Sequence, residues 1–142
     1  MIGNPDGHRA AYWDIPRDLT ILADVRTMIR QTLTTWELAG AGELTDDIVL
    51  ATTEVLSNAV LYGLPPIEFT LRMSGETLCA EVTDHGAGRP ERTAGDDDES
   101  EHGRGLTIVE ALSDEWGVQP SPEGSAKTVW FRKRCSHLEP AT

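Results

Sequence analysis

Glu54 and Asn58 are two polar side chains four residues apart in a segment whose apolar residues recur at helical spacing. On a helix, side chains at positions i and i+4 project from the same face. A carboxylate at Glu54 can act there as a general base, beside an amide oxygen of Asn58 that binds a hard cation. Mg²⁺ keeps several waters and shares phosphate oxygens, so one asparagine is a sufficient protein ligand. The alternative is that both residues belong to the solvated face of a surface helix.

Asp84 is a second candidate, because it continues the alternation of the apolar residues in the strand-like segment 78–82. Its carboxylate should therefore point toward the covered face of the strand. A buried carboxylate without a partner costs about 1–3 kcal/mol or more, and the exocyclic amine of a purine would supply one. Gly86 and Gly88 would let a flat ring approach the backbone closely. The alternative is a turn in which Asp84 caps the backbone after a strand.

A third candidate is the glycine pair that leads into another apolar segment in the order Gly103-Arg104-Gly105-Leu106. Backbone N–H groups at a helix N-terminus bind anions, and Arg104 adds positive charge. The preceding stretch, 85–102, has no periodicity and is crowded with acidic residues at 96–101. Long loops in compact domains are often functional, and a lid over a nucleotide would have this form. The alternative is that the acidic run is only a solvated loop.

Helical periodicity predicts two helices in the first half of the chain. The first begins near Asp18 and buries the stripe Leu22, Val25, Ile29, Leu33 and Trp36. The second begins near Glu43 with Thr45 as its N-cap, ends at Gly63, and buries Ile48, Ala51, Val55, Ala59 and Tyr62. Glu54 and Asn58 lie outside this second stripe.

Strict alternation of apolar residues predicts a β-hairpin, with strands at 67–73 and 78–82 joined by the turn at 74–76. A short strand is also expected at 10–15, before the first helix. The hairpin carries Asp84 just beyond its second strand.

The last part of the chain is expected to hold a third helix, which Gly105 opens, and two further strands at 115–118 and 127–131. The order β-α-α-β-β-α-β-β predicts an α+β fold. Specifically, we expect a two-layer α/β sandwich in which three helices cover one face of a mixed, mostly antiparallel sheet. Three tryptophans are expected in its core: Trp36, Trp116 and Trp130.

The chain has 142 residues, the size of one domain, and a formal net charge of −12. A strong negative field repels phosphate backbones and anionic lipid, which argues against a direct nucleic-acid or membrane partner. It does not exclude one small anionic ligand that is held by local donors.

The two cysteines, Cys79 and Cys135, do not suggest a disulfide framework. The chain shows neither a secretion signal nor an apolar run of about 20 residues, so a cytoplasmic location is expected. One folded domain is expected at 11–134, between a flexible N-terminal segment at 1–10 and a C-terminal tail at 135–142.

The three candidate segments resemble, in order and spacing, the N, G1 and G2 boxes of the GHKL superfamily: 54–59, 84–88 and 103–106. That superfamily includes sensor histidine kinases, type II topoisomerases and mismatch-repair ATPases. The closing pattern at 116–118 and 127–131 is similar to the branch of bacterial anti-sigma-factor serine kinases and related stand-alone ATP-binding regulators. The resemblance implies a histidine kinase-like ATPase fold that binds ATP and Mg²⁺.

The resemblance also implies a role for each candidate residue. Glu54 would be the catalytic base, Asn58 the Mg²⁺ ligand, and Asp84 the reader of the adenine amino group. The remaining nucleotide contacts would come from Thr128, which would assist Asp84, from Gly86 and Gly88 on the adenine side, and from Gly103, Arg104, Gly105 and Leu106 at the lid and phosphates. Because guanine presents a carbonyl oxygen where adenine has its amine, Asp84 alone predicts a preference for ATP over GTP.

Two functions stay open at this point. The first is an anti-sigma factor with serine/threonine protein kinase activity, which phosphorylates an anti-anti-sigma partner and sequesters a sigma factor. The second is an ATP-dependent protein-binding switch with no phosphotransfer activity. A degenerate domain that has lost ATP is a third alternative. Similar proteins imply a homodimer.

Overall fold

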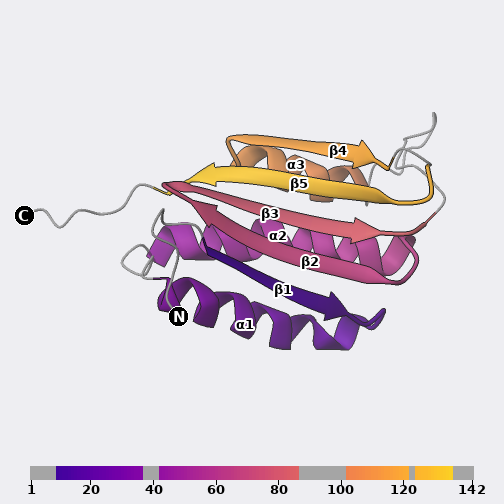
Figure 1. The fold of residues 1–142 in the computed structure, drawn as a ribbon, viewed down its shortest axis with the longest axis horizontal. Helices are drawn as coiled ribbons and strands as arrows, with labels where there is room; N and C mark the ends of the chain where they lie inside the picture. The colour runs from indigo at the N-terminus through magenta and orange to yellow at the C-terminus, as the bar shows by residue number, and fades with distance from the viewer. Residues whose placement is uncertain (1–8, 37–41, 87–101, 122–123, 136–142) are drawn as a thin grey trace, which may run out of the picture.

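The computed structural model describes residues 9–36, 42–86, 102–121 and 124–135 of the chain, and only the backbone of Gly42 and of 102–106. These residues form one sheet and three helices (Figure 1). The elements are β1 (Arg9–Ile15), α1 (Leu22–Thr35), α2 (Gly42–Tyr62), β2 (Ile67–Ser74), β3 (Thr77–Asp84), α3 (His102–Leu112), β4 (Glu115–Pro120) and β5 (Lys127–Arg134). The predicted order of strands and helices is therefore confirmed.

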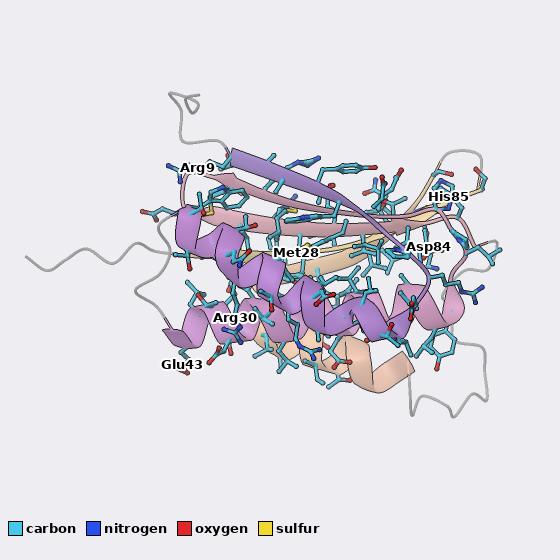
Figure 2. The ribbon with its side chains drawn as sticks, turned by 90° about the horizontal axis from the view of Figure 1, so that it is seen from below. Arg9, Met28, Arg30, Glu43, Asp84 and His85 are labelled. Carbon is cyan, nitrogen blue, oxygen red and sulfur yellow. The ribbon has the colours of Figure 1, made fainter. Side chains whose placement is uncertain are left out.

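The sheet has the strand order β1-β2-β3-β5-β4, and every neighbouring pair is antiparallel. The three helices lie on one side of it, which leaves the other face of the sheet open (Figure 2). The predicted two-layer α+β sandwich is confirmed. The sheet is wholly antiparallel in the described residues rather than mixed, because β1 and β5 each run against the hairpin strand beside them.

The core fills the space between the helices and the covered face of the sheet. Burial alternates along β2 and β3 as the hairpin pattern predicts, since each strand turns every second side chain toward the helices. The largest fully buried side chains come from both layers and include Phe69, Phe131, Ile29, Leu33, Ile48 and Leu56. Trp13 stacks on Phe69 with ring centroids 5.0 Å apart.

The tryptophan prediction is right for two of three residues. Trp36 and Trp116 are partly buried and pack against the core. Trp130 instead lies on the open face of the sheet, because it alternates with the buried Phe131. Its ring lies under the Arg132 guanidinium, 4.7 Å from the ring centroid, and the prediction of a core position was wrong.

The helix boundaries differ from the sequence expectation at three places. Asp18 caps a short 3-10 turn, Leu19–Ile21, by accepting a hydrogen bond from the Thr20 backbone N–H, and α1 begins only after that turn. Thr45 lies inside α2, which already begins at Gly42, so it is not the N-cap. Tyr62 is 48% exposed although it continues the buried stripe, and it is the last residue of α2.

The C-terminal end of the sheet is tied to the β2–β3 hairpin. The Cys135 backbone N–H donates to the Glu76 carbonyl oxygen over 2.7 Å, and the Cys135 side chain is fully buried. Gly75 in that turn has a φ of +61°, a conformation that glycine adopts without strain. Both cysteines are free thiols. No helix of the described residues has the length and apolar character needed to span a bilayer.

Candidate functional site

Asp84 is the last residue of β3 and faces the helices, with only 2% of its surface exposed. Figure 2 shows it between the sheet and the helical layer. Its Oδ1 accepts a hydrogen bond from the Gly86 backbone N–H over 2.8 Å. The expectation that the carboxylate points to the covered face is therefore confirmed.

Two glycines make the space that this carboxylate occupies. A Cβ atom at Gly63, the residue after α2, would lie 2.5 Å from the Asp84 Cγ, and one at Gly86 would lie 3.1 Å from the Oδ1. The first distance is far below any real carbon–carbon contact, so only glycine fits at Gly63. The sequence had indicated Gly63 only as a helix end. Its second role became visible only when the register placed Asp84 against it.

The His85 backbone and ring fix the end of β3 to the connection that follows α2. The His85 backbone N–H donates to the Leu64 carbonyl oxygen over 2.9 Å, and its ring Nδ1 lies 2.9 Å from the Pro66 carbonyl oxygen. These contacts fix the chain directly after Asp84, and the strand pairing of β3 fixes it before Asp84. A carboxylate fixed in this way is preorganised for a ligand.

Lys127 is the partner of Asp84 that the sequence reasoning missed. The two residues are directly opposite in the β3–β5 register. The Lys127 Nζ lies 3.0 Å from the Oδ2 of Asp84 and 3.3 Å from its Oδ1, and the lysine side chain is only 15% exposed. The signal was present in the alternation of β5, where Phe131, Val129 and Lys127 share the covered face.

Thr128 does not lie beside Asp84. Because it is adjacent to Lys127 on β5, it points to the open face of the sheet, where its hydroxyl oxygen lies 2.6 Å from that of Thr83. The expected assistance to Asp84 therefore does not fit the structure. The physical reason is the period of two in a strand, which moves a side chain to the other face with a shift of one residue.

Glu54 and Asn58 lie one turn apart on α2, and both side chains are half-buried. Neither makes a hydrogen bond or an ion pair with any residue that the structure describes. At 1.5 Å per residue, Asn58 lies about 7.5 Å before Gly63 along the helix axis, and Glu54 about 13.5 Å before it. Glu54 and Asn58 thus lie on the part of α2 that leads toward Gly63, against which the Asp84 carboxylate lies.

Other predicted site residues fall partly or wholly outside the described structure. Gly88 and the acidic stretch at 96–101 lie outside the described residues. The backbone of Gly103, Arg104, Gly105 and Leu106 is helical, since α3 begins at His102, and nothing is described of their side chains. Gly105 therefore does not open the helix. Gly103 and Gly105 both lie inside it, at a cost of about 1 kcal/mol each relative to alanine.

The described residues fit an adenine nucleotide in part. The glycine-lined position of Asp84 and the unpaired Glu54 and Asn58 suit a base at one end and Mg²⁺ with phosphates at the other. The described residues contain no group of three His, Cys, Asp or Glu side chains that could hold a metal ion by themselves. A cation at Asn58 would therefore need water and phosphate oxygens as its remaining ligands.

Comparison with known proteins places most of the described fold in one family. Residues 15–133 match the family described as the histidine kinase-like ATPase domain. The crystal structure of the RsbU and RsbW domains of Rv1364c from Mycobacterium tuberculosis superposes with a TM-score of 0.68 at 20% sequence identity. The match covers 92% of this chain and 33% of that chain, so the chain spans about a third of its solved relative.

A second solved structure, the Acinetobacter baumannii histidine kinase AdeS, matches with a TM-score of 0.48 at 16% identity, over 91% of this chain and 70% of that chain. A search of curated proteins gave no match.

Proposed function

The chain belongs to the histidine kinase-like ATPase domain family, and from that premise we propose that it is an ATP-binding regulator of the anti-sigma type. In this proposal it is a serine/threonine protein kinase that acts on an anti-anti-sigma partner and sequesters a sigma factor in the cytoplasm. One observation carries the nucleotide part. A 2% exposed carboxylate, Asp84, is held in a glycine-lined position at the end of the helix that bears Glu54 and Asn58, which pair with no other described residue.

In this proposal each site residue takes the role that the family resemblance implies. Asp84 accepts a hydrogen bond from the adenine amino group, and Gly86 holds the carboxylate in place through its backbone N–H. Asn58 contributes its amide oxygen to Mg²⁺, which supplies charge neutralisation for the phosphates when it is bound. Glu54 accepts the proton of the partner hydroxyl that attacks the γ-phosphate.

The proposed partners are two proteins, and the charge of the chain supports one of them. A sigma factor is basic over the surface that contacts DNA, so a chain with a net charge of −12 attracts it electrostatically. The anti-anti-sigma protein would present the serine or threonine that receives the phosphate. The resemblance of the chain also supports a homodimer as the functional unit.

The kinase part is tested by transfer of labelled γ-phosphate from ATP to an anti-anti-sigma protein of the same organism. Wild type is expected to label the partner, while Glu54→Gln binds ATP with unchanged affinity and transfers at least about a hundredfold more slowly. Equal transfer by both proteins would remove Glu54 from the role of base. Thr53→Val, a change at the preceding position of α2, is the matched control and is expected to transfer normally.

A second candidate function is an ATP-dependent protein-binding switch without phosphotransfer. It is favoured by the composition of α2, which contains four acidic residues and no lysine, arginine or histidine to neutralise a triphosphate. If ATP alters formation of the sigma-factor complex while no partner is phosphorylated, this function replaces the first.

A further inference from the structure

Lys127 makes a contact that neither the family resemblance nor the predicted site accounts for. Lysine is almost never this buried unless it is paired, and the Lys127 side chain is 15% exposed with its ammonium on the Asp84 carboxylate. The other lysine of β5, Lys133, shares the same face but lies near the opposite end of the strand, where its Nζ donates to the Leu112 carbonyl oxygen over 2.8 Å. Only Lys127 therefore approaches Asp84 among the described residues of this strand.

The ion pair keeps an unused acceptor beside an unused donor. Among the described residues, the Asp84 Oδ1 accepts from the Gly86 backbone N–H and lies 3.3 Å from the Lys127 Nζ, whereas the Oδ2 has only that ammonium, 3.0 Å away. An ionised carboxylate has about four acceptor positions, so one on Oδ2 stays open. An ammonium carries three donors, and the described residues give Lys127 only the two oxygens of Asp84 as acceptors.

We propose that Lys127 is a second reader of the base, and that its ammonium donates to the ring nitrogen N1 of adenine while Asp84 accepts from the exocyclic amine. The proposal rests on the proposed function, since it concerns the base pocket of that nucleotide site. On adenine the amine is a donor, and N1, which is bonded to the carbon that bears the amine, is an acceptor. Oδ2 of Asp84 and Nζ of Lys127 present the complementary acceptor and donor in the same order.

The burial of the pair favours N1 over N7, the other ring nitrogen near the amine. N7 belongs to the five-membered ring that carries the ribose, whereas N1 lies in the six-membered ring, on the side away from the ribose and the phosphates. Asp84 is 2% exposed and the Lys127 side chain 15% exposed. Groups enclosed to this degree meet the end of the base that enters first, which is the end that carries N1.

This second contact sharpens the choice of base. Guanine has a carbonyl oxygen in place of the amine and an N–H at N1, so two acceptors would be opposed at Asp84 and two donors at Lys127. Asp84 alone opposes guanine only at the first position. Because buried polar groups left without partners are costly, a site with two such oppositions discriminates more strongly than a site with one. Lys127 therefore adds to the preference for ATP that Asp84 predicts.

Calorimetric titration with four triphosphates, each with Mg²⁺, tests the contact atom by atom. They are ATP, GTP, 1-deaza-ATP, in which a C–H replaces N1, and 7-deaza-ATP, in which a C–H replaces N7 while N1 is kept. The proteins are wild type, Lys127→Met, Lys127→Gln and the control Lys133→Met, with circular dichroism to establish that each is folded. Lys127→Gln keeps a neutral donor, so it decides the question if Asp84 does not tolerate methionine beside it.

Wild type is expected to bind ATP and 7-deaza-ATP with dissociation constants within about threefold, 1-deaza-ATP at least about tenfold more weakly, and GTP at least about a hundredfold more weakly. Lys127→Met should bind ATP more weakly, and its affinities for ATP and 1-deaza-ATP should be within about threefold. Its preference for ATP over GTP should fall as well. Lys127→Gln should reduce the loss with 1-deaza-ATP by a smaller factor, and Lys133→Met should leave every ratio unchanged.

The ratio of ATP to 1-deaza-ATP separates a direct contact from a positioning role. A lysine that only held Asp84 in place would, when replaced, weaken both nucleotides by the same factor and leave their ratio as in wild type. That result in the folded Lys127 variants overturns the proposal and leaves the proposed ATP site intact. So does a wild type that binds 1-deaza-ATP as tightly as ATP, or one that loses affinity for 7-deaza-ATP instead. Folded wild type that binds none of the four nucleotides overturns the proposed function, and this inference with it.

Discussion

Two neighbouring cross-strand pairs on β3 and β5 differ in the face of the sheet they occupy, in their burial and in the kind of contact they make. Asp84 and Lys127 face the helices as a buried ion pair, whereas Thr83 and Thr128, one residue away on the same strands, face the open side of the sheet. In the first pair Asp84 lies against Gly63 at the end of α2, while the second pair is half-buried and forms a hydroxyl–hydroxyl contact. The comparison shows that the face of the sheet, rather than proximity along the chain, decides which residue lies in the covered layer, where we propose that the nucleotide binds.

The largest effect on the free energy of unfolding should come from a substitution on the covered face of β5, compared with one at the adjacent residue on the open face. Phe131 is 1% exposed in the core, whereas Trp130 lies on the open face against Arg132. Phe131→Ala should lower the free energy of unfolding by about 3–5 kcal/mol. Trp130→Ala should lower it by about 1 kcal/mol, as a cation–π contact on a half-buried ring would. Urea unfolding followed by circular dichroism measures both, and equal losses would contradict the assignment of faces.

The sequence was sufficient for the fold because its periodicities are strong. The alternation in β2 and β3 and the helical stripes of α1 and α2 each have a single arrangement that buries their apolar residues. The alternation of β3 was likewise sufficient to predict that Asp84 faces the helices.

The sequence could not assign the side of the sheet for β5 with the same certainty. Lys127 and Thr128 are both polar, so neither residue type indicates which of them faces the helices. The assignment follows only from counting back in steps of two from the buried Phe131. A resemblance carried over position by position then selected the threonine, although the register brings the lysine to Asp84. The role of Gly63 was equally hidden, since it depends on a contact between α2 and β3 that no local pattern contains.

The next largest effect should come from Gly63→Ala. Its Cβ would lie 2.5 Å from the Asp84 Cγ and 2.8 Å from the Ala59 carbonyl oxygen, so the carboxylate or the end of α2 must shift. We expect a loss of about 1–3 kcal/mol in the free energy of unfolding, together with weaker nucleotide binding. Leu61→Ala on the exposed side of α2 is the matched control, with a change within about 0.5 kcal/mol. Unchanged stability of Gly63→Ala would show that the Asp84 position is not as tightly enclosed as described.

The two cysteine thiols lie on opposite faces of the sheet, and the pKa of each predicts how stability depends on pH. Burial raises the pKa of Cys135 to about 11, and burial also raises the pKa of Cys79 on the opposite face of the sheet. Because the folded pKa of Cys135 lies above its ordinary value of 9.0, its contribution to stability is complete below pH 9 and is lost as the pH rises toward 11. The contribution is up to about 2 kcal/mol.

This pH dependence is measured by comparing wild type with Cys135→Ala. Wild type should lose more of its free energy of unfolding between pH 9 and pH 11 than the variant does, whatever constant offset the lost packing adds. Parallel pH profiles for the two proteins would show that Cys135 does not resist ionisation in the folded state.

The smallest effect should come from an ion pair outside the covered face. Arg72 and Glu81 lie 3.3 Å apart with side chains 51% and 31% exposed, in contrast to the buried Asp84–Lys127 pair. Arg72→Ala should change the free energy of unfolding by about 0–1 kcal/mol, and added salt should reduce the difference further. Thermal unfolding at low and high salt measures this, and a loss above about 2 kcal/mol would mean that the open face contributes far more to stability than its exposure implies.

Binding of Mg·ATP to three proteins tests the nucleotide site most directly: wild type, Asp84→Asn on the covered face and Thr128→Val on the open face. Calorimetric titration should show binding by wild type, a loss of at least about tenfold in Asp84→Asn, and a change of no more than about threefold in Thr128→Val. Circular dichroism establishes that the variants are folded. Normal binding by Asp84→Asn, or a loss in Thr128→Val with none in Asp84→Asn, would contradict the placement of the nucleotide on the covered face beside Asp84.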